Sequence, residues 1–258
     1  SENNRIRRVS GGNINTIAGT DIRDGGLATN AILNQPHGAY RDAGGNLWIT
    51  DTRNYRVRKV DSAGRIATVV GTGYSGNTEG RIGRGRGVVV DSRGNLYWSD
   101  SSNNRIMQLP AGSTSPRVFA GPVNGGTAGF SGDGGNGTSA RFDDPRGIAL
   151  DARDNLYIAD WGNNRVRRVS TDGVVSTVAG NGRTAASGDG AAATSAGVSP
   201  SAVALDKDGN LFVADDLNNR VRRVAASDGV ITTHAGTGAF GFGGDGGQAR
   251  AATIALPE

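Results

Sequence analysis

The sequence Asn163-Asn164-Arg165-Val166-Arg167-Arg168-Val169 indicates the architecture, because near-copies of it recur four more times along the chain of 258 residues. A repeat this strict indicates one supersecondary unit that is used several times. The spacing between equivalent arginines is 49 to 60 residues, which is enough for several short strands per unit. The other copies begin at Asn3, Asn54, Asn103 and Asn218.

A second motif precedes four of the five copies. Before Asn163 it reads Gly147-Ile148-Ala149-Leu150-Asp151-x-x-Asp154-Asn155-Leu156-Tyr157-Ile158-Ala159-Asp160. Two β-branched or aromatic runs around an Asp-x-x-Gly-Asn type of turn predict two strands and a tight connection. The arginine-rich run predicts a third strand, and an apolar run such as 174–179 predicts a fourth. The equivalent two-strand stretches are 38–51, 87–100 and 202–215.

Four antiparallel strands per unit predict an all-β protein, a β-propeller made of four-stranded blades. No helical period is present along the chain, which disfavours α/β folds. Four repeats are complete and one is incomplete, so five blades' worth of sequence is present. The chain ends where a first strand is expected, and an open sheet edge is normally avoided. Closure of the ring is therefore expected to need further material.

We predict a single propeller domain over 1–258. A partial repeat at 1–20 opens the chain, and 237–258 is the start of a closing blade. The complete repeats are expected at about 36–71, 85–121, 145–180 and 200–236.

These units resemble the NHL repeat family of β-propellers. The residues that carry the resemblance are the Asn155 to Asp160 stretch followed by Asn163 to Arg167, together with the links Gly132-Asp133-Gly134-Gly135 and Gly244-Asp245-Gly246-Gly247. Weaker forms of the link are Gly188-Asp189-Gly190 and Asp24-Gly25-Gly26, while the region 77–80 departs from it. The resemblance is to a bacterial type of the family and leaves open a parent propeller of six blades.

Composition narrows the possible chemistry. The 43 glycines lie between apolar runs and are typical of turns. Cysteine is absent, which excludes disulfides and thiolate metal sites. No run of about 18 apolar residues predicts a membrane span. The net charge is +4, and 13 of the 28 basic residues lie in the five arginine-rich strands. Periodic placement spreads these charges around a propeller, so nucleic acid is not the expected partner.

Four aspartates each lie five residues before an arginine, at the same place in every complete repeat. They could form a ring of acid–base or ion sites, or they could hold the blades together. The structural interpretation is favoured, because repeat packing needs the same pair in every unit and catalysis does not. A carboxylate can cap the turn, and the arginine fork can hold a carboxylate of the same or the next blade. The pairs are Asp51 with Arg56, Asp100 with Arg105, Asp160 with Arg165, and Asp215 with Arg220.

A recognition site is expected where the repeats differ. One such position is the entry of the first strand, near the mouth of the central channel, where His37, Arg86 and Arg146 have Ser201 and Glu258 as equivalents. Tyr55 and Trp161 lie in the turns before the arginine-rich strands. Exposed aromatic residues beside variable loops are typical of binding surfaces. We therefore predict a non-enzymatic binding module of a bacterial extracellular or cell-envelope protein, with a protein, peptide or glycan as its ligand.

Two other functions stay open. Some propellers similar to this chain hold a metal in the central channel for lyase or lactonase chemistry, and some NHL propellers bind RNA on a basic face. Arg81, Arg84 and Arg86 form the one local cluster for RNA. The single carboxylate of each Gly-Asp-Gly-Gly link lacks the alternating acids of a calcium loop. With two histidines and no cysteine, no catalytic residue set, metal site or cofactor is predicted.

Overall fold

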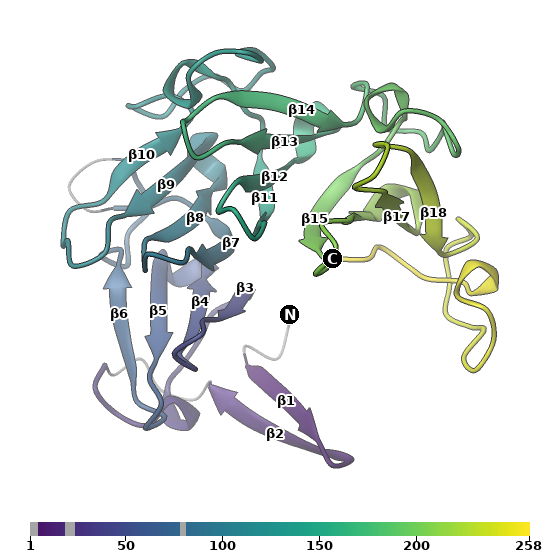
Figure 1. Cartoon of the computed structure of the whole chain (residues 1–258). Coiled ribbons are helices and arrows are strands. Elements are labelled where there is room, and N and C mark those ends of the chain that lie inside the picture. Colours follow the sequence, from purple (N-terminus) through teal and green to yellow (C-terminus); the bar gives the residue numbers. More distant parts are fainter. Residues whose placement is uncertain (1–4, 19–23, 78–80) are drawn as a thin grey trace. The chain divides into compact units, whose positions relative to one another are not determined.

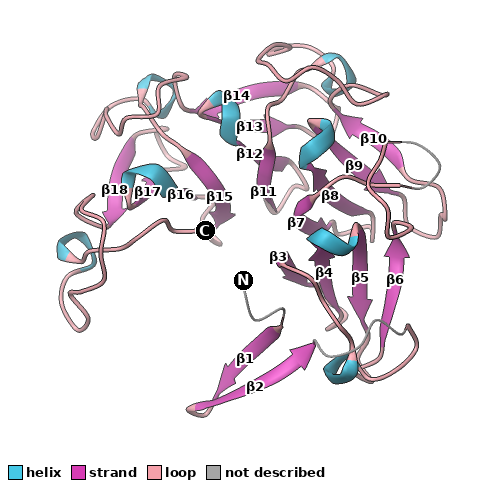
Figure 2. Ribbon diagram, turned by 180° about the vertical axis from the view of Figure 1, so that it is seen from behind, coloured by secondary structure: helices cyan, strands magenta, loops and turns pink. Residues whose placement is uncertain are grey.

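The fold is given by a computed structural model that describes residues 5–18, 24–77 and 81–258. The beginning of the first repeat copy, at Asn3 and Asn4, and most of the divergent 77–80 link lie outside the described residues. Strands, turns and one-turn 3₁₀ helices make up the described part, as Figure 2 shows. No helix in this part is long and apolar enough to cross a membrane.

The chain divides into two compact units, residues 1–118 and 119–258. The first unit holds a hairpin and the first blade, β3 to β6, followed by most of the second blade, β7 to β10 (Figure 1). The strands up to the division are β1 (Ile6–Ser10), β2 (Asn13–Ala18), β3 (Pro36–Arg41), β4 (Leu47–Asp51), β5 (Arg56–Val60), β6 (Ile66–Val70), β7 (Gly85–Val90), β8 (Leu96–Asp100), β9 (Arg105–Leu109) and β10 (Arg117–Ala120), which contains the division itself.

The second unit holds the third blade, β11 to β14, and the fourth blade, β15 to β18. Its strands are β11 (Pro145–Leu150), β12 (Leu156–Asp160), β13 (Arg165–Val169), β14 (Val175–Ala179), β15 (Pro200–Leu205), β16 (Leu211–Asp215), β17 (Arg220–Val224) and β18 (Ile231–Ala235). In every blade the strands are hydrogen-bonded in chain order, as in an up-and-down propeller blade. The prediction of four complete repeats and one incomplete repeat is confirmed, since four sheets have four strands and β1–β2 has two.

The turn between the first two strands of each blade is built around an aspartate. In the third blade, Asp151 Oδ1 accepts hydrogen bonds from the amides of Arg153 and Asn155, both at 2.9 Å. The Asn155 side chain also donates to Asp151 Oδ2 at 2.7 Å. The carboxylate thus satisfies the turn amides, which explains the Asp-x-x-Gly-Asn spacing.

A 3₁₀ turn joins the second and third strands of each blade. It follows the repeated aspartate directly, as in η5 (Trp161–Asn163), and ends on a residue in the left-handed region, Asn164 with φ +51°. Asparagine tolerates this conformation better than most residues, which accounts for the second Asn of the repeat. In the first blade Tyr55 occupies the position at φ +50° after η2 (Thr52–Asn54).

Neighbouring blades within each unit bury a common apolar core. In the second unit, Val166 and Ala179 of the third blade pack with Val203 and Val213 of the fourth. The first strands of the two blades approach so closely that a Cβ on Gly147 would lie 2.7 Å from Ala202 Cα. Glycine is needed there because any side chain would force the blades apart.

Candidate recognition site

Each repeated aspartate is fully buried and fastens the turn to the link that precedes its blade. Asp160 accepts hydrogen bonds from the amide of Asp143 and from the Asn163 side chain, both at 2.8 Å. Asp51 and Asp215 accept the same pair of bonds from their own links and turns. These carboxylates therefore hold the turn and the link of each blade together. The local hydrogen bonds compensate for the loss of water around a buried charge.

The arginine that meets the buried aspartate is not the one five residues on in three of the four blades. Asp160 faces Arg165 across the β12–β13 pair, but its Oδ2 lies 3.4 Å from Nη1 of Arg167. Arg167 is itself fully buried and also binds Asp133 of the Gly-Asp-Gly-Gly link, with Nη2 at 2.7 Å from Oδ1. The same bridge is formed by Arg58 between Asp51 and Asp24, and by Arg222 between Asp215 and Asp189.

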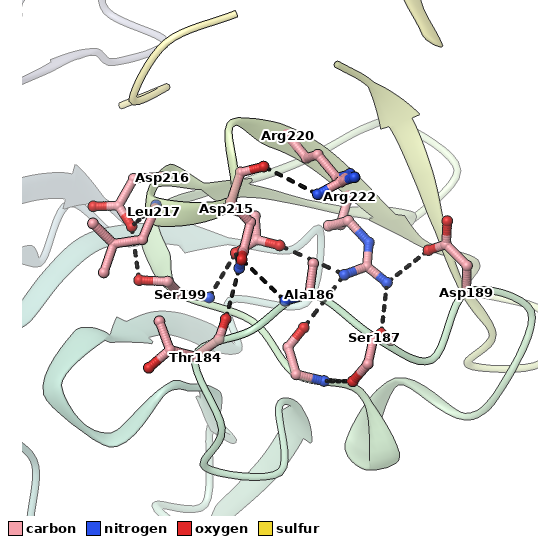
Figure 3. A network of polar contacts seen from close by, with 12 residues as sticks. Thr184, Ala186, Ser187, Asp189, Ser199, Asp215, Asp216, Leu217, Arg220 and Arg222 are labelled. Carbon is pink, nitrogen blue, oxygen red and sulfur yellow. Dashed lines mark hydrogen bonds and ion pairs between the residues drawn. The ribbon is translucent and has the colours of Figure 1, made fainter. Parts of the chain in front are cut away.

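Figure 3 shows this network in the fourth blade, with Arg222 between Asp189 and Asp215. Its Nη2 lies 2.6 Å from Asp189 Oδ1 and also donates to the Ser187 carbonyl at 3.0 Å. A small cavity of about 220 Å³ borders the network and is lined by Asp189, Arg220, Arg222 and Thr233 among others. The guanidinium thus joins link, turn and strand into one buried unit.

The first arginine of the repeat has a different role in these three blades. Arg165 donates to the carbonyls of Asn163 at 2.9 Å and Asn181 at 3.1 Å. A Cβ on Gly182 would lie 2.8 Å from its guanidinium, so the glycine allows the arginine to lie flat on the following link. The predicted pair is formed only in the second blade, where Arg105 Nε donates to Asp100 at 2.8 Å.

Burial controls the ionisation of the repeated carboxylates. It raises the pKa of Asp160 to about 7, although the Asp143 amide, Asn163 and Arg167 all favour the charged form. Burial also raises the pKa of Asp51 and Asp215. The pKa of the link residue Asp189 is lowered, because its bonds to Thr233 and Arg222 outweigh its partial burial.

Two of the predicted recognition residues meet in the second unit. The Arg146 guanidinium stacks on the Trp161 ring, with its Cζ 3.5 Å from the ring centroid. Arg146 also pairs with Asp144, Nη2 to Oδ2 at 2.9 Å, and lies 3.7 Å from Asp216 of the fourth blade. The Trp161 indole donates to the same Asp216 carboxylate at 3.2 Å. We call these four residues the Arg146 cluster.

The cluster is held by the frame beneath it. Asp216 accepts a hydrogen bond from Ser199 Oγ at 2.8 Å and directly follows the buried Asp215. Arg146 is only 14% exposed, so its stack on the indole is partly desolvated. Cation–π pairs gain strength when water is excluded from them. The arrangement combines an aromatic surface, an indole N–H and a guanidinium whose charge is compensated by Asp144 and Asp216.

The other predicted recognition residues lie in the first unit. His37 is exposed on β3, and Arg86 is half-buried on β7 of the next blade. The two strands are close here, because Thr50 Oγ1 of the first blade donates to the Arg86 carbonyl at 3.2 Å. Tyr55 is half-buried and packs against the apolar core between the first and second blades. Its ring therefore covers the blade end.

In the part of the chain that the structure describes, no three His, Asp or Glu side chains gather in a way that could hold a metal ion. His234 packs edge-on against Phe212, with 5.0 Å between ring centroids. Phe130 lies over Arg165 at 3.8 Å, whereas Phe240 and Phe242 are exposed.

Two sets of functional groups were missed by sequence reasoning. They are the second arginines of the repeat, Arg58, Arg167 and Arg222, and the link aspartates Asp24, Asp133 and Asp189 as their partners. The signal was present in the sequence. The second blade has Met107 in place of this arginine and also lacks the Gly-Asp-Gly link, so the two features occur or are missing together.

Two protein-family models match parts of the chain, and both describe NHL repeats. The family model described as "NHL repeat" matches residues 33–60, and the model "Teneurin NHL domain" matches residues 125–187. A search of curated protein sequences finds no match.

Solved structures show the same fold at low sequence identity. A protein in a nidogen/laminin complex is similar with TM-score 0.62 and 17% identity, covering 91% of this chain and 76% of that chain. A structural genomics protein of Bacteroides thetaiotaomicron, described as of unknown function, has TM-score 0.56 and 19% identity over 98% of this chain and 75% of its own.

Virginiamycin B lyase from Staphylococcus aureus is similar with TM-score 0.50 and 19% identity, over 77% of this chain. The chain spans about half, 54%, of that lyase. At these identities the likeness is one of fold alone, and it confirms the predicted β-propeller. The matches of two NHL models, together with the repeated motifs and the four-stranded blades, support the assignment of these repeats to the NHL repeat family.

Proposed function

We propose that the chain is a non-enzymatic binding module that recognises a protein, a peptide or a glycan through the surface around Arg146 and Trp161. The observation that carries the proposal is the Arg146 cluster, in which the guanidinium lies 3.5 Å from the indole centroid and both groups face Asp216. The group stands at positions where the repeats differ from one another. Such positions can specify a ligand without disturbing the repeated frame.

The division between frame and surface supports this proposal. The repeated Asp160 and Arg167 are fully buried and hold the blade, so they are not available to a ligand. Trp161 is partly exposed, and Leu217 beside Asp216 is exposed as well. Tryptophan and arginine, together with tyrosine, are enriched among the energetically dominant contacts of protein interfaces. A cluster already held in place would lose little conformational entropy on binding.

The fold likeness agrees with a binding role. The proposal also includes a location outside the cell or in the cell envelope of a bacterium. A similar fold occurs in a complex of two proteins, nidogen and laminin. This support is an analogy of fold, which hosts many functions. The likeness to virginiamycin B lyase is likewise one of fold and supplies no reacting residue in this chain.

The test is a binding screen of peptide and glycan arrays with the purified chain, repeated with Trp161→Ala and with Arg146→Ala. A ligand of this surface should bind at least tenfold more weakly to both variants. Arg153→Ala is the matched control, because Arg153 is an exposed arginine in the β11–β12 turn of the same blade. Equal binding by all four proteins would reject the Arg146 cluster as the recognition site.

A further inference from the structure

The links before the third and fourth blades share one backbone course and differ at one important side chain. Each link forms an antiparallel bridge to the residue before the last strand of its blade, Asn136 with Val174 and Ala192 with Val230. The glycine before the link aspartate has φ +91° in the first of these links and +77° in the second, and the glycine after it has +80° and +84°. In this alignment Ala186 stands at the position of Phe130.

In the third blade, the ring of Phe130 covers two arginines. Its centroid lies 3.8 Å from Cζ of Arg165 and 4.7 Å from Cζ of Arg167. Arg165 donates only to the carbonyls of Asn163 and Asn181 and forms no ion pair with any residue that the structure describes. The face of an aromatic ring attracts such a cation. Phe130 therefore meets a charge that no carboxylate satisfies.

The fourth blade has the same arginines without the ring. Arg220 donates to the carbonyls of Asn218 at 3.2 Å and Thr237 at 2.7 Å, and it too forms no ion pair among the described residues. The methyl group of Ala186 cannot cover it. A cavity of about 220 Å³ is present instead, and Figure 3 shows Ala186, Arg220 and Arg222 among the residues that line it.

Arg222 is also satisfied less completely than its counterpart in the third blade. Arg167 Nε donates to Asp133 at 3.0 Å. Arg222 is buried, and its Nε has no hydrogen-bond acceptor within the described part of the chain. The wall of the cavity thus holds one guanidinium without a carboxylate and another with an N–H group to spare.

The surroundings of this cavity are complete in the chain. In the third blade, the hydrogen bonds and ion pairs of the two arginines come from the blade itself, from the link before it and from the first residues of the link after it. The fourth blade has all of these partners in equivalent places, namely Ser187, Asp189, Gly197, Asp215, Asn218 and Thr237. The fourth blade differs in lacking the ring.

Size and charge indicate which group fits the cavity. A cavity of about 150 Å³ is enough to bind benzene, so 220 Å³ has room for one six-membered ring. The carboxylate of Asp189 also lines the cavity and is 51% exposed. It would repel a carboxylate or phosphate group placed beside it. A neutral aromatic ring avoids this repulsion and still attracts the guanidinium groups.

We propose that the cavity over Arg220 and Arg222 binds a neutral aromatic ring, the phenyl or phenol group of a ligand, at the place that Phe130 fills in the third blade. The ring belongs either to a free small aromatic compound or to a phenylalanine or tyrosine side chain of a peptide. The site differs from the Arg146 cluster and does not depend on the function proposed above.

The probe is p-cresol, which is the side chain of tyrosine, titrated into the intact chain labelled with ¹⁵N. Nuclear magnetic resonance of the arginine Nε–H groups reports the ring directly, because a ring current moves protons above its face to lower frequency. We expect saturable shifts of the Arg220 and Arg222 signals. Arg220→Lys identifies the first signal. Cyclohexanol, which has the size of the probe but no π face, should cause at most a tenth of these shifts.

Two variants exchange the cavity and the ring between the blades. Ala186→Phe fills the cavity from within and should weaken p-cresol binding at least tenfold. Ala191→Phe is the matched control, since Ala191 is an exposed alanine of the same link that does not line the cavity. Phe130→Ala should open a second site, at which p-cresol moves the signals of Arg165 and Arg167.

A second probe, N-acetyltyrosine amide, distinguishes the two sources of the ring. Binding of both probes supports a ring presented by a peptide, and binding of p-cresol alone supports a free aromatic compound. Three results would overturn the proposal: no shift of the Arg220 and Arg222 signals in the intact chain, equal binding by Ala186→Phe, or displacement of p-cresol by acetate or phosphate, which would assign the cavity to an anion. The backbone amide spectrum of each variant shows whether it is folded.

Discussion

The second and third blades pair their buried aspartate with an arginine in different ways. In the third blade, Arg167 bridges the buried Asp160 and the link residue Asp133. In the second blade the equivalent position is Met107, and Arg105 Nε reaches Asp100 directly at 2.8 Å. Both aspartates are fully buried. Each accepts one hydrogen bond from an amide of the preceding link and one from an asparagine side chain of the turn.

The difference shows that the second arginine and the link aspartate form one unit. Where the link has its aspartate, the arginine is present and fully buried, as Arg58, Arg167 and Arg222 are. Where the link reads Asn77-Thr78-Glu79-Gly80, methionine takes the position and packs in the apolar core between the first and second blades. A buried guanidinium needs a carboxylate and further acceptors that satisfy its charge and its N–H groups.

The largest expected effect comes from giving the third blade the residue of the second. Arg167→Met removes the cation between two carboxylates, one of them fully buried. Breaking a buried pair in this way should cost about 3–5 kcal/mol of unfolding free energy. Urea denaturation followed by circular dichroism measures it. Arg153→Met, at an exposed turn position of the same blade, should change stability by less than about 0.5 kcal/mol.

The reverse exchange tests whether the second blade lacks only the arginine or the whole unit. Met107→Arg places a guanidinium in the apolar core, where Asp100 already binds Arg105 and Asn103. We expect a loss of about 2–3 kcal/mol in the same urea assay. Met107→Leu, which keeps the volume and adds no charge, should cost less than about 1.5 kcal/mol. A stabilising Met107→Arg would contradict the link between the two features.

The pH dependence of stability distinguishes the buried carboxylate from ordinary ones. The pKa of Asp160 is about 7 in the folded protein against a reference of 3.8, so the folded state binds the extra proton between these values. The contribution of Asp160 therefore weakens as the pH rises from about 4 to 7, by at most about 1.4 kcal/mol per pH unit. The loss of unfolding free energy caused by Asp160→Asn should therefore be larger at pH 5 than at pH 7.

The control for this experiment is Asp206→Asn. Hydrogen bonds from Asn210 lower the pKa of Asp206 in its turn, so its contribution is complete above the reference value and lost only in acid. The loss of unfolding free energy caused by Asp206→Asn should stay constant between pH 5 and pH 7. Urea midpoints of the three proteins at both pH values give the comparison. A loss of unfolding free energy in Asp160→Asn that stays constant from pH 5 to pH 7, as expected for Asp206→Asn, would show that Asp160 is ionised throughout this range.

Local sequence rules were sufficient for the strands but not for the ion pairs. The β-branched and aromatic runs and the Asp-x-x-Gly-Asn type of turn follow from contacts within one blade, and the strands and turns they predict are confirmed. Arg165 is opposite Asp160 in the register, which made it the natural partner. The actual partner, Arg167, reaches across the strand pair and over to a link 34 residues away. That distance in sequence leaves no local pattern.

The recognition residues show the same limit. Sequence reasoning named Arg146 and Trp161 because both stand at positions that differ among the repeats. Their stack depends on Asp216 of the next blade, which binds both of them and which sequence reasoning did not select. Packing between blades decides which variable positions meet, and one sequence without its fold does not contain that information.

The smallest expected effect compares two links instead of two blades. Asp133→Asn removes the charge that holds Arg167 but keeps an oxygen that can accept its bonds, and Asp133 is partly exposed. We expect a loss of about 1–2 kcal/mol. Asp245→Asn makes the same change in the link that follows the fourth blade, residues 236–258, where the carboxylate meets no arginine within the described residues. It should leave stability unchanged within about 0.5 kcal/mol. If both variants lost stability equally, the loss in Asp133→Asn would not come from its pairing with Arg167.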